Sequence, residues 1–335
     1  MLYMRTDMND VVATGHIMRC LAIADAARNL GEETVFLTAD DCPAKLLKQR
    51  GYAYHVLGTR WDDMEFELPA LLEMVHKKKI KKLLIDSYYV TETYLAALGA
   101  YVEIYYLDDL NAFRYPVSSI ICYANYWKQF CYEKCYKGVK LYLGAQYVPL
   151  REAFRLCGKK RMKARVENLL ILSGGTDRYH AINGILAQIN RQRYEKIEVV
   201  CGGYYPRYSE LCAKYAKEEN VAIYSSVSDI ENHMKAADLA ISASGTTLYE
   251  LCACGTPTIS YVLADNQIHN ATSFQADKII DYAGDIRTDD VPQNICKMLD
   301  RYEYNVALRA ERSAKMQALI DGEGAERLAE ILREV

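Results

Sequence analysis

Short apolar runs alternate with longer segments of helical periodicity along the whole chain. The runs are Leu2–Arg5, Thr34–Leu37, Leu83–Ile85, Val102–Leu107 and Ser119–Cys122, then Leu169–Leu172, Ile197–Val200, Ala222–Tyr224, Leu239–Ile241 and Thr258–Tyr261. Helical patterns lie between them, for example at His16–Leu30, Ala181–Arg191, Tyr208–Glu218 and Thr246–Cys254. Because the short runs are continuously apolar rather than alternating, they predict parallel strands that are covered on both faces. The chain is therefore expected to be an α/β protein with doubly wound, Rossmann-like sheets.

The strand-helix rhythm occurs twice, with a break near Tyr147–Glu167 where Pro149 and a charged stretch interrupt it. We expect an N-terminal domain over residues 1–150 and a C-terminal domain over residues 165–325. The last helix, about 326–335, is a candidate to pack back on the first domain. Two such domains predict an interdomain cleft at the carboxyl ends of their sheets, where ligands of these folds bind.

The composition of the chain argues against several classes of function. The 335 residues carry a net charge near −3, which gives no basic field for nucleic acid. No apolar stretch is long enough to insert in a membrane, and no secretory signal is visible. The 11 cysteines lie mostly in apolar segments, as expected for reduced thiols in a cytoplasmic protein. Cys131 and Cys135 lack a second ligand pair nearby, so no metal site is expected.

A glycine-histidine pair, Gly15 and His16, follows the first predicted strand and opens the first predicted helix. Glycine at such a turn lets another group approach the backbone. Histidine is the side chain best suited to accept a proton near neutral pH. These residues predict a general base facing a ligand. A capping or packed histidine explains them equally well.

A second constellation follows a strand of the C-terminal half. Ser244, Gly245, Thr246 and Thr247 end an apolar run and begin a helix, where free amides and hydroxyls favour an anion. Glu250 lies one helical turn after Thr246 and could hold a ribose diol. Gly174 and Gly175 would let a ligand approach a second stretch of backbone closely. Taken together, the two loops and Glu250 predict a binding site for a nucleoside diphosphate. Each loop alone is also explained as an ordinary tight turn, and neither a P-loop nor a dinucleotide fingerprint is present.

Two acidic segments follow other predicted strands. Asp86 could pair with His16, bind a ligand or cap the next helix. Asp108 and Asp109 are adjacent, so their side chains point to opposite faces of a strand. One of these two carboxylates is therefore expected to have a structural role rather than to share a metal.

The chain resembles the family of UDP-2,4-diacetamido-2,4,6-trideoxy-β-L-altropyranose hydrolases of pseudaminic acid synthesis, which are related to spore-coat polysaccharide proteins. The resemblance covers nearly the whole chain in order. It rests on Arg5-Thr6-Asp7, Gly15-His16-Ile17-Met18-Arg19-Cys20-Leu21, Asp86-Ser87-Tyr88, Asp108-Asp109, Leu143-Gly144 through Phe154, Gly174-Gly175-Thr176-Asp177, Ala237-Asp238 through Glu250, and Ala264-Asp265-Asn266-Gln267. That family has the GT-B fold of the MurG-type glycosyltransferases.

The resemblance implies inverting hydrolysis of a UDP-sugar without metal or cofactor. His16 would take a proton from the attacking water, the Ser244–Thr247 loop would stabilise the leaving diphosphate, and Glu250 would bind ribose. Asn266 and Gln267 would meet the sugar or its phosphate. The remaining substrate-binding residues would be Arg5, Asp7, Gly15, Arg19, Asp86, Tyr88, Gly174 and Gly175.

The chain departs from the family pattern at Ala13, where glycine is usual, at Met8-Asn9, and at Ser244. The first two departures lie near the expected sugar side and leave the sugar's identity open. An inverting glycosyltransferase would use the same base on a sugar hydroxyl. A non-hydrolysing epimerase and a binding protein for nucleotide sugars share the architecture as well. The sequence leaves the oligomeric state open.

Overall fold

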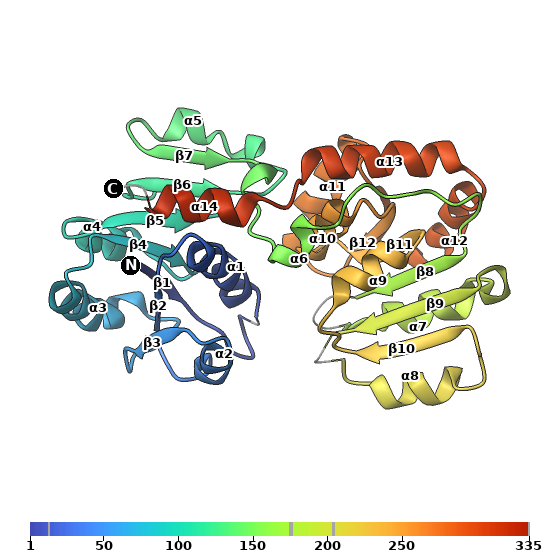
Figure 1. The fold of residues 1–335 in the computed structure, drawn as a ribbon, viewed down its shortest axis with the longest axis horizontal. Helices are drawn as coiled ribbons and strands as arrows, with labels where there is room; N and C mark the ends of the chain where they lie inside the picture. The colour runs from blue at the N-terminus through green and yellow to red at the C-terminus, as the bar shows by residue number, and fades with distance from the viewer. Residues whose placement is uncertain (13, 174–176, 203–204, 334–335) are drawn as a thin grey trace. The chain divides into compact units, whose positions relative to one another are not determined.

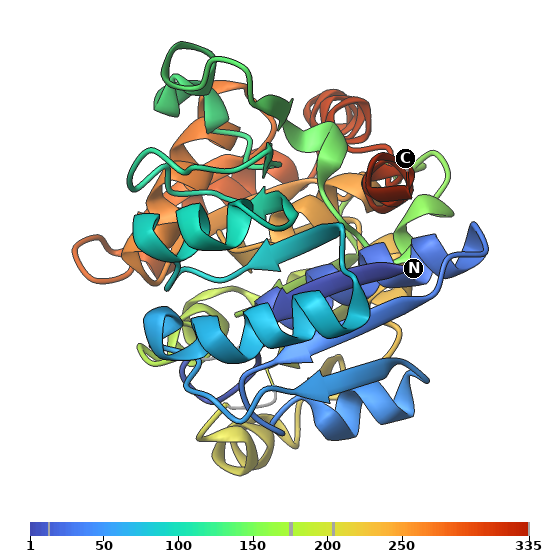
Figure 2. The same ribbon diagram turned by 90° about the vertical axis from the view of Figure 1, so that its left-hand side faces the viewer.

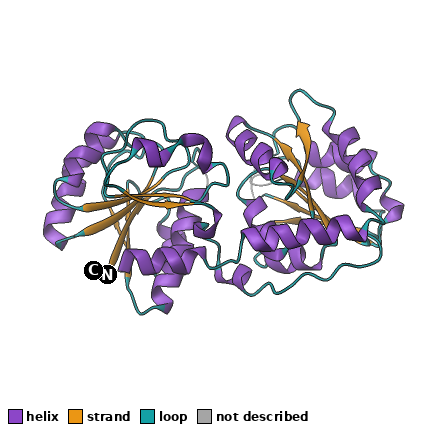
Figure 3. Ribbon diagram, turned by 90° about the horizontal axis from the view of Figure 1, so that it is seen from above, coloured by secondary structure: helices purple, strands orange, loops and turns teal. Residues whose placement is uncertain are grey.

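Two α/β units make up the chain in the computed structural model, which describes residues 1–12, 14–173, 177–202 and 205–333 (Figure 1). Unit 1 comprises Met1–Glu152 and Gly322–Val335, and unit 2 comprises Ala153–Asp321. Each unit has one parallel sheet with helices on both faces (Figure 3). This arrangement explains why most of the strands are continuously apolar, since they face a helical layer on either side.

The sheet of unit 1 has the strand order β3-β2-β1-β4-β5-β6-β7, with every neighbouring pair parallel. Its strands are β1 (Leu2–Thr6), β2 (Thr34–Thr38), β3 (Ala53–Val56), β4 (Lys82–Asp86), β5 (Glu103–Leu107), β6 (Ser119–Cys122) and β7 (Lys140–Leu143). The chain builds outward from β1 to β3 and then returns to lay β4 on the other side of β1. This reversal puts the carboxyl ends of β1 and β4 side by side, with Thr6 opposite Asp86.

Helices cover both faces of the first sheet. They are α1 (Gly15–Asn29), α2 (Ala44–Gln49), α3 (Met64–Lys78), α4 (Glu92–Gly99), α5 (Tyr132–Cys135) and α14 (Gly324–Arg333). The short helix α6 (Glu152–Arg155) spans the boundary between the two units. The helices α3 and α4 pack together in front of the strands in Figure 2. Helix α14 packs on α1. Its first residue, Gly324, is so close to the backbone of Val148 that an added Cβ would lie 2.2 Å from the Val148 carbonyl oxygen.

The sheet of unit 2 has the order β10-β9-β8-β11-β12-β13, again parallel throughout. Its strands are β8 (Asn168–Leu172), β9 (Lys196–Cys201), β10 (Val221–Ser225), β11 (Leu239–Ala243), β12 (Thr258–Val262) and β13 (Asp281–Asp285). Its helices are α7 (Ala181–Gln188), α8 (Tyr208–Tyr215), α9 (Ile230–Ala236), α10 (Thr247–Cys254), α11 (Ile268–Ala276), α12 (Val291–Tyr302) and α13 (Val306–Leu319). Helix α12 packs with α7, and α10 packs with α9 and α13. The strand order reverses between β8 and β11.

All ten predicted strands are confirmed, and three further strands were missed. These are β3, β7 and β13, which all lie at a sheet edge. An edge strand is partly solvated, so it need not be continuously apolar as an inner strand is, although the fourth edge strand, β10, was predicted. The residues of β3 are intermediate or exposed, and β13 contains two aspartates and a glycine among its five residues. Among the described residues, no helix is both long and apolar enough to cross a membrane.

Candidate active site

The carboxylate of Asp86 is the centre of a buried polar cluster in unit 1. Asp86 is the last residue of β4 and is 1% exposed. Its Oδ1 lies 2.6 Å from His16 Nδ1, and its Oδ2 accepts a hydrogen bond from Arg19 Nε at 2.5 Å. Arg19 Nη2 also donates to Oδ1, and the thiol of Cys20 lies 3.6 Å from Oδ2. His16, Arg19 and Cys20 are spaced i, i+3 and i+4 on α1, so one helix face presents all three to one carboxylate.

The Asp86 contact determines which ring nitrogen of His16 carries a proton. An ionised carboxylate only accepts hydrogen bonds, so a separation of 2.6 Å requires a proton on Nδ1. Arg19 Nη2 lies 2.9 Å from the same Nδ1, and both groups then donate to Asp86 Oδ1. In neutral histidine this leaves Nε2 as the acceptor. The arrangement of a buried aspartate that orients a histidine is the one used by general-base histidines.

Charge and hydrogen bonding keep Asp86 ionised. Burial opposes ionisation, but the charges of Arg19 and His16 and their hydrogen bonds outweigh it and hold the pKa of Asp86 well below its usual value. The Asp86–Arg19 pair is nearly enclosed, with side-chain exposures of 0% and 12%. Arg19 Nη1 also donates to the hydroxyl of Tyr123 at 2.8 Å. The guanidinium is therefore fixed on two sides, and it holds the carboxylate that orients His16.

A small pocket opens beside the His16 ring. It is lined by Asp7, Val12, His16, Trp61, Asp86, Ser87, Tyr88 and Tyr89. The Tyr88 ring meets the His16 ring edge-on, with centroids 4.7 Å apart, and its hydroxyl donates to Asp109 Oδ2 at 2.8 Å. Burial raises the pKa of Asp109 despite the nearby Arg19, and its Oδ1 is buried with no hydrogen-bond partner in the described part of the chain. The pocket thus combines the histidine with aromatic walls.

Arg5 was expected to contact the ligand, but it is buried and does not line the pocket. It is fully buried, and its guanidinium donates to both carboxylate oxygens of Glu67 and, at 2.5 Å, to Asp7 Oδ2. Asp7 Oδ1 accepts the backbone N–H of Ala39 at 2.9 Å. Arg5 therefore holds Asp7 at the pocket but does not line it. Burial raises the pKa of Asp7, against the lowering effect of Arg5.

The structure removes one alternative for Asp86 and shows the partners of Asp108 and Asp109. Asp86 does not cap the following helix, because Thr91 is the N-cap of α4. Asp108 holds its own loop through the hydroxyls of Tyr115 and Tyr132 and the backbone N–H of Asn111. Its neighbour Asp109 has different partners, the Tyr88 hydroxyl and Arg19. Within the described ranges, no three His, Cys, Asp or Glu side chains are grouped as a metal site requires.

In unit 2, the loop after β11 leads into the N-terminus of α10 at the point where the strand order reverses. Among the described residues, the N-cap Thr246 makes no side-chain capping bond, so the first amides of this helix can donate to a ligand. Thr246 is exposed, and Gly245, Thr247 and Glu250 are partly exposed. A Cβ on Gly245 would have no neighbour closer than Gln267 Nε2, at 3.9 Å. This loop therefore has open space beside Gly245, backbone amides at the start of α10, and the side-chain amide of Gln267 nearby.

Ser244 departs from the expectation that its hydroxyl would serve a ligand. It is 0% exposed, and its Oγ lies 2.6 Å from Ser260 Oγ and donates to the Tyr261 carbonyl at 2.9 Å. Its backbone N–H also bonds to Tyr261. Ser244 thus ties β11 to β12.

Asn266 is exposed in a short 3₁₀ turn after β12, and Gly174 and Gly175 fall outside the described residues.

The sequence reasoning missed Glu67 and Tyr123. Glu67 lies on the buried face of α3 with Met64, Leu71 and Val75, and its carboxylate also accepts the hydroxyl of Tyr94. A carboxylate at an otherwise apolar position of a helix predicts a buried ion pair, so the sequence could have indicated Glu67. Tyr123 carries no such signal, because only the fold brings it to Arg19.

Comparison with known proteins agrees with this architecture. Residues 169–328 match the glycosyltransferase family 28 C-terminal domain. The chain is 26% identical over 203 residues to the spore coat polysaccharide biosynthesis protein SpsG of Bacillus subtilis, covering 58% of this chain and 59% of that protein. It is 26% identical over 183 residues to an Acetivibrio thermocellus UDP-N-acetylglucosamine–N-acetylmuramyl-(pentapeptide) pyrophosphoryl-undecaprenol N-acetylglucosamine transferase, covering 50% and 47%. The crystal structure of Acinetobacter baumannii MurG is similar with a TM-score of 0.71 at 13% identity, covering 100% of this chain and 99% of that one.

This chain has a GT-B fold. The fold class predicted from the sequence is confirmed by the full-length structural match and by the two parallel sheets. The chain spans about half of the length of the curated relatives it matches, between 47% and 59%.

Proposed function

We propose that this protein hydrolyses a UDP-linked amino sugar at its anomeric carbon, with release of UDP and inversion of configuration. The observation that carries the proposal is the 2.6 Å contact between His16 Nδ1 and the buried Asp86 carboxylate. This contact leaves His16 Nε2 as a base in a pocket that also presents Asp7 and Tyr88. The similarity to a spore coat polysaccharide biosynthesis protein supports a role in making a surface polysaccharide. A 2,4-diacetamido-2,4,6-trideoxy sugar is the substrate that the family resemblance favours.

In the proposed reaction, water loses a proton to His16 Nε2 as its oxygen attacks the anomeric carbon. The bond from that carbon to the diphosphate oxygen breaks, and UDP leaves from the opposite face of the sugar. Asp86 stabilises the imidazolium that forms, because its carboxylate stays ionised while accepting the Nδ1 proton. Arg19 acts on this step through the carboxylate of Asp86. Tyr88 and Asp7 line the sugar side, and Arg5 acts by holding Asp7.

The loop at the N-terminus of α10 is proposed to hold the diphosphate. The amides of Gly245, Thr246 and Thr247 would donate to phosphate oxygens, and the helix dipole favours the negative charge of the leaving group. Glu250 is proposed to bind the ribose, and Gln267, which faces Gly245, to bind phosphate or sugar. No step of this scheme requires a cofactor.

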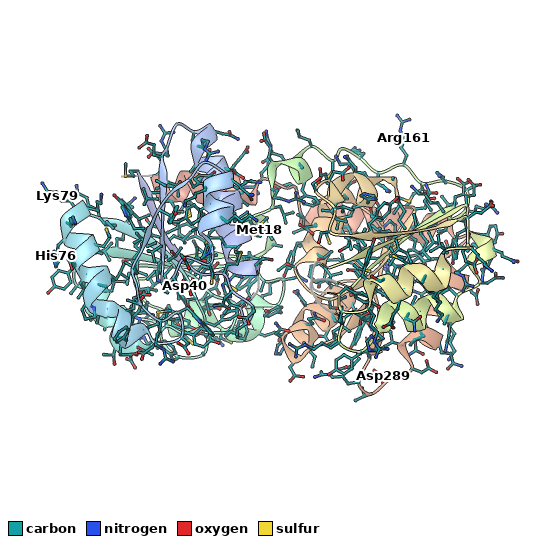
Figure 4. The ribbon with its side chains drawn as sticks, turned by 90° about the horizontal axis from the view of Figure 1, so that it is seen from below. Met18, Asp40, His76, Lys79, Arg161 and Asp289 are labelled. Atoms are coloured by element: carbon teal, nitrogen blue, oxygen red, sulfur yellow. The ribbon has the colours of Figure 1, made fainter. Side chains whose placement is uncertain are left out.

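Replacing His16 by alanine tests the base. We expect kcat for UDP release to fall by about 10²- to 10⁴-fold, while the affinity for UDP changes little. The matched control is His76→Ala, because His76 is exposed at the end of α3, at the outer edge of unit 1, with its ring against Tyr101 (Figure 4). Turnover of His16→Ala within a factor of three of the His76→Ala control would remove His16 from the mechanism.

A glycosyltransferase is the second candidate, and the match to the glycosyltransferase family 28 C-terminal domain favours it. The same base would then deprotonate a sugar hydroxyl instead of water. A panel of UDP-amino sugars incubated in ¹⁸O-labelled water separates the two functions. Hydrolysis puts the label on the anomeric oxygen of free sugar, with the opposite configuration by proton NMR. UDP release only when an acceptor is added would establish the transferase.

A further inference from the structure

A cavity of about 590 Å³ lies in unit 2, away from the loop at the N-terminus of α10. It is bounded by the segment 154–162, by α13 and by the residues around Ala253 near the C-terminal end of α10. The lining residues Lys159, Ala310 and Ala314 are exposed, so the cavity is open to solvent. Arg161 in the same segment extends outward from unit 2 (Figure 4). Small molecules in solution can therefore reach the cavity wall.

Two cysteines meet at this wall. Cys157 lines the cavity and is partly exposed, and its Sγ lies 3.3 Å from the Sγ of Cys254. Cys254 is the last residue of α10 and is only 1% exposed. Both are free thiols. The sulfur of Cys157 is thus accessible from the cavity, and the sulfur of Cys254 is buried next to it at hydrogen-bond distance.

The charges around this pair favour a thiolate at Cys157. Lys160 Nζ donates to the carbonyls of Lys235 and Ala237 at the end of α9, and the charge of Lys160 acts on both sulfurs. The hydrogen bond from Cys254 is the main cause that lowers the pKa of Cys157, with Lys235 and Lys160 adding to it against burial and Glu231. The same hydrogen bond, with burial, raises the pKa of Cys254. The accessible sulfur therefore loses its proton first, and the buried sulfur keeps its own.

We propose that Cys157 and Cys254 form a peroxide-reactive thiol pair, in which Cys157 is oxidised first and Cys254 closes a reversible disulfide. The Cys157 thiolate attacks one peroxide oxygen, the O–O bond breaks, and the products are a sulfenic acid and hydroxide. The Cys254 sulfur then attacks the Cys157 sulfur. The sulfenic oxygen leaves as water with the proton from Cys254. Two thiols and one hydrogen peroxide thus give one disulfide and two waters.

Peptide mapping tests the pair directly. Reduced protein is treated with one to five equivalents of hydrogen peroxide, blocked with N-ethylmaleimide and digested with trypsin. We expect a disulfide between peptide 156–159 and peptide 236–278, assigned to Cys254 rather than Cys252 by fragmentation. The exposed Cys131 is an internal control, and Cys157 should be oxidised about tenfold faster. Dithiothreitol should restore both free thiols.

Two variants separate the roles of the sulfurs. Cys254→Ser should accumulate a sulfenic acid at Cys157, which a 1,3-dione reagent captures. Cys157→Ser should leave the buried Cys254 unreacted. Oxidation of Cys157 no faster than Cys131 in the wild-type protein, or a wild-type Cys157 that passes to sulfinic acid without forming the link, would overturn the proposal. The wild-type measurement decides the question even if a variant misfolds, and it does not depend on UDP-sugar hydrolysis.

Discussion

Replacing Asp86 by asparagine should damage both the stability and the activity of unit 1. Asparagine keeps the size of the side chain but removes the charge that Arg19 and His16 share. Breaking a buried ion pair costs about 3–5 kcal/mol because the remaining charge loses its partner. The Arg19 side chain keeps 12% exposure and its contact with Tyr123, so the lower end, about 3 kcal/mol, is expected.

The effect on activity follows from the proton on His16. The side-chain carbonyl of the introduced asparagine would accept from Arg19, and its amide N–H₂ would then face His16 Nδ1. That contact favours the tautomer with the proton on Nε2, which can no longer act as a base. We expect kcat for UDP release to fall by about 10²- to 10⁴-fold. UDP affinity should stay within a few-fold of wild type, because the proposed diphosphate loop is in unit 2.

Tryptophan fluorescence makes the stability measurement specific to unit 1. The two tryptophans, Trp61 and Trp127, both belong to this unit. With a urea slope of about 2 kcal/mol/M, a loss of about 3 kcal/mol lowers the midpoint by about 1.5 M. Asp25→Asn is the control, because Asp25 lies on the same helix as His16 and Arg19 and pairs with Arg50 at the surface. That variant should lose at most about 1 kcal/mol.

The pH dependence gives an independent check. The pKa of Asp86 is lower in the folded protein than in the unfolded chain, where it is about 3.9. Asp86 therefore stabilises unit 1 above about pH 4, and this stabilisation is lost as the pH falls toward the folded value. The difference in urea midpoint between wild type and Asp86→Asn should narrow below about pH 4. A variant with wild-type turnover and the midpoint of the Asp25→Asn control would refute the role of Asp86.

Four further substitutions test the proposed diphosphate loop, the packing of α14 and the Arg5 ion pair. Gly245→Val should fold, since the space beside Gly245 is open, but should weaken UDP binding in calorimetry by at least about tenfold by blocking phosphate from the helix amides. Ser244→Ala should instead leave UDP affinity unchanged and cost about 1 kcal/mol of stability, and equal loss of affinity in both variants would contradict the assigned orientations. Gly324→Ala should destabilise unit 1 by about 1–3 kcal/mol in urea unfolding, whereas Gly99→Ala, where a Cβ has room, should stay within about 1 kcal/mol. Glu67→Gln should cost unit 1 about 3–5 kcal/mol by leaving a buried guanidinium without its main partner, and unchanged fluorescence-detected unfolding would show that this ion pair is dispensable.

The inner strands were predictable because a strand covered on both faces must be apolar at every position. The edge strand β3, which contains Tyr54 and His55, need not be apolar at every position, and it was missed. The position of His16 at the start of a helix was equally readable, since a turn after a strand is a local feature. Glu67 was readable in principle as a carboxylate on an apolar helix face, but nothing local shows that its partner is Arg5.

The sequence by itself determined the α/β class, the inner strands of the two sheets and the spacing that puts His16, Arg19 and Cys20 on one helix face. These features depend on local periodicity and on the apolar or polar character of each residue. Only the tertiary structure decided that Asp86 receives all three side chains, that Arg5 turns inward to Glu67 and that Ser244 bonds to β12. These contacts join residues up to 70 positions apart, and they depend on which strands become neighbours when the sheet order reverses.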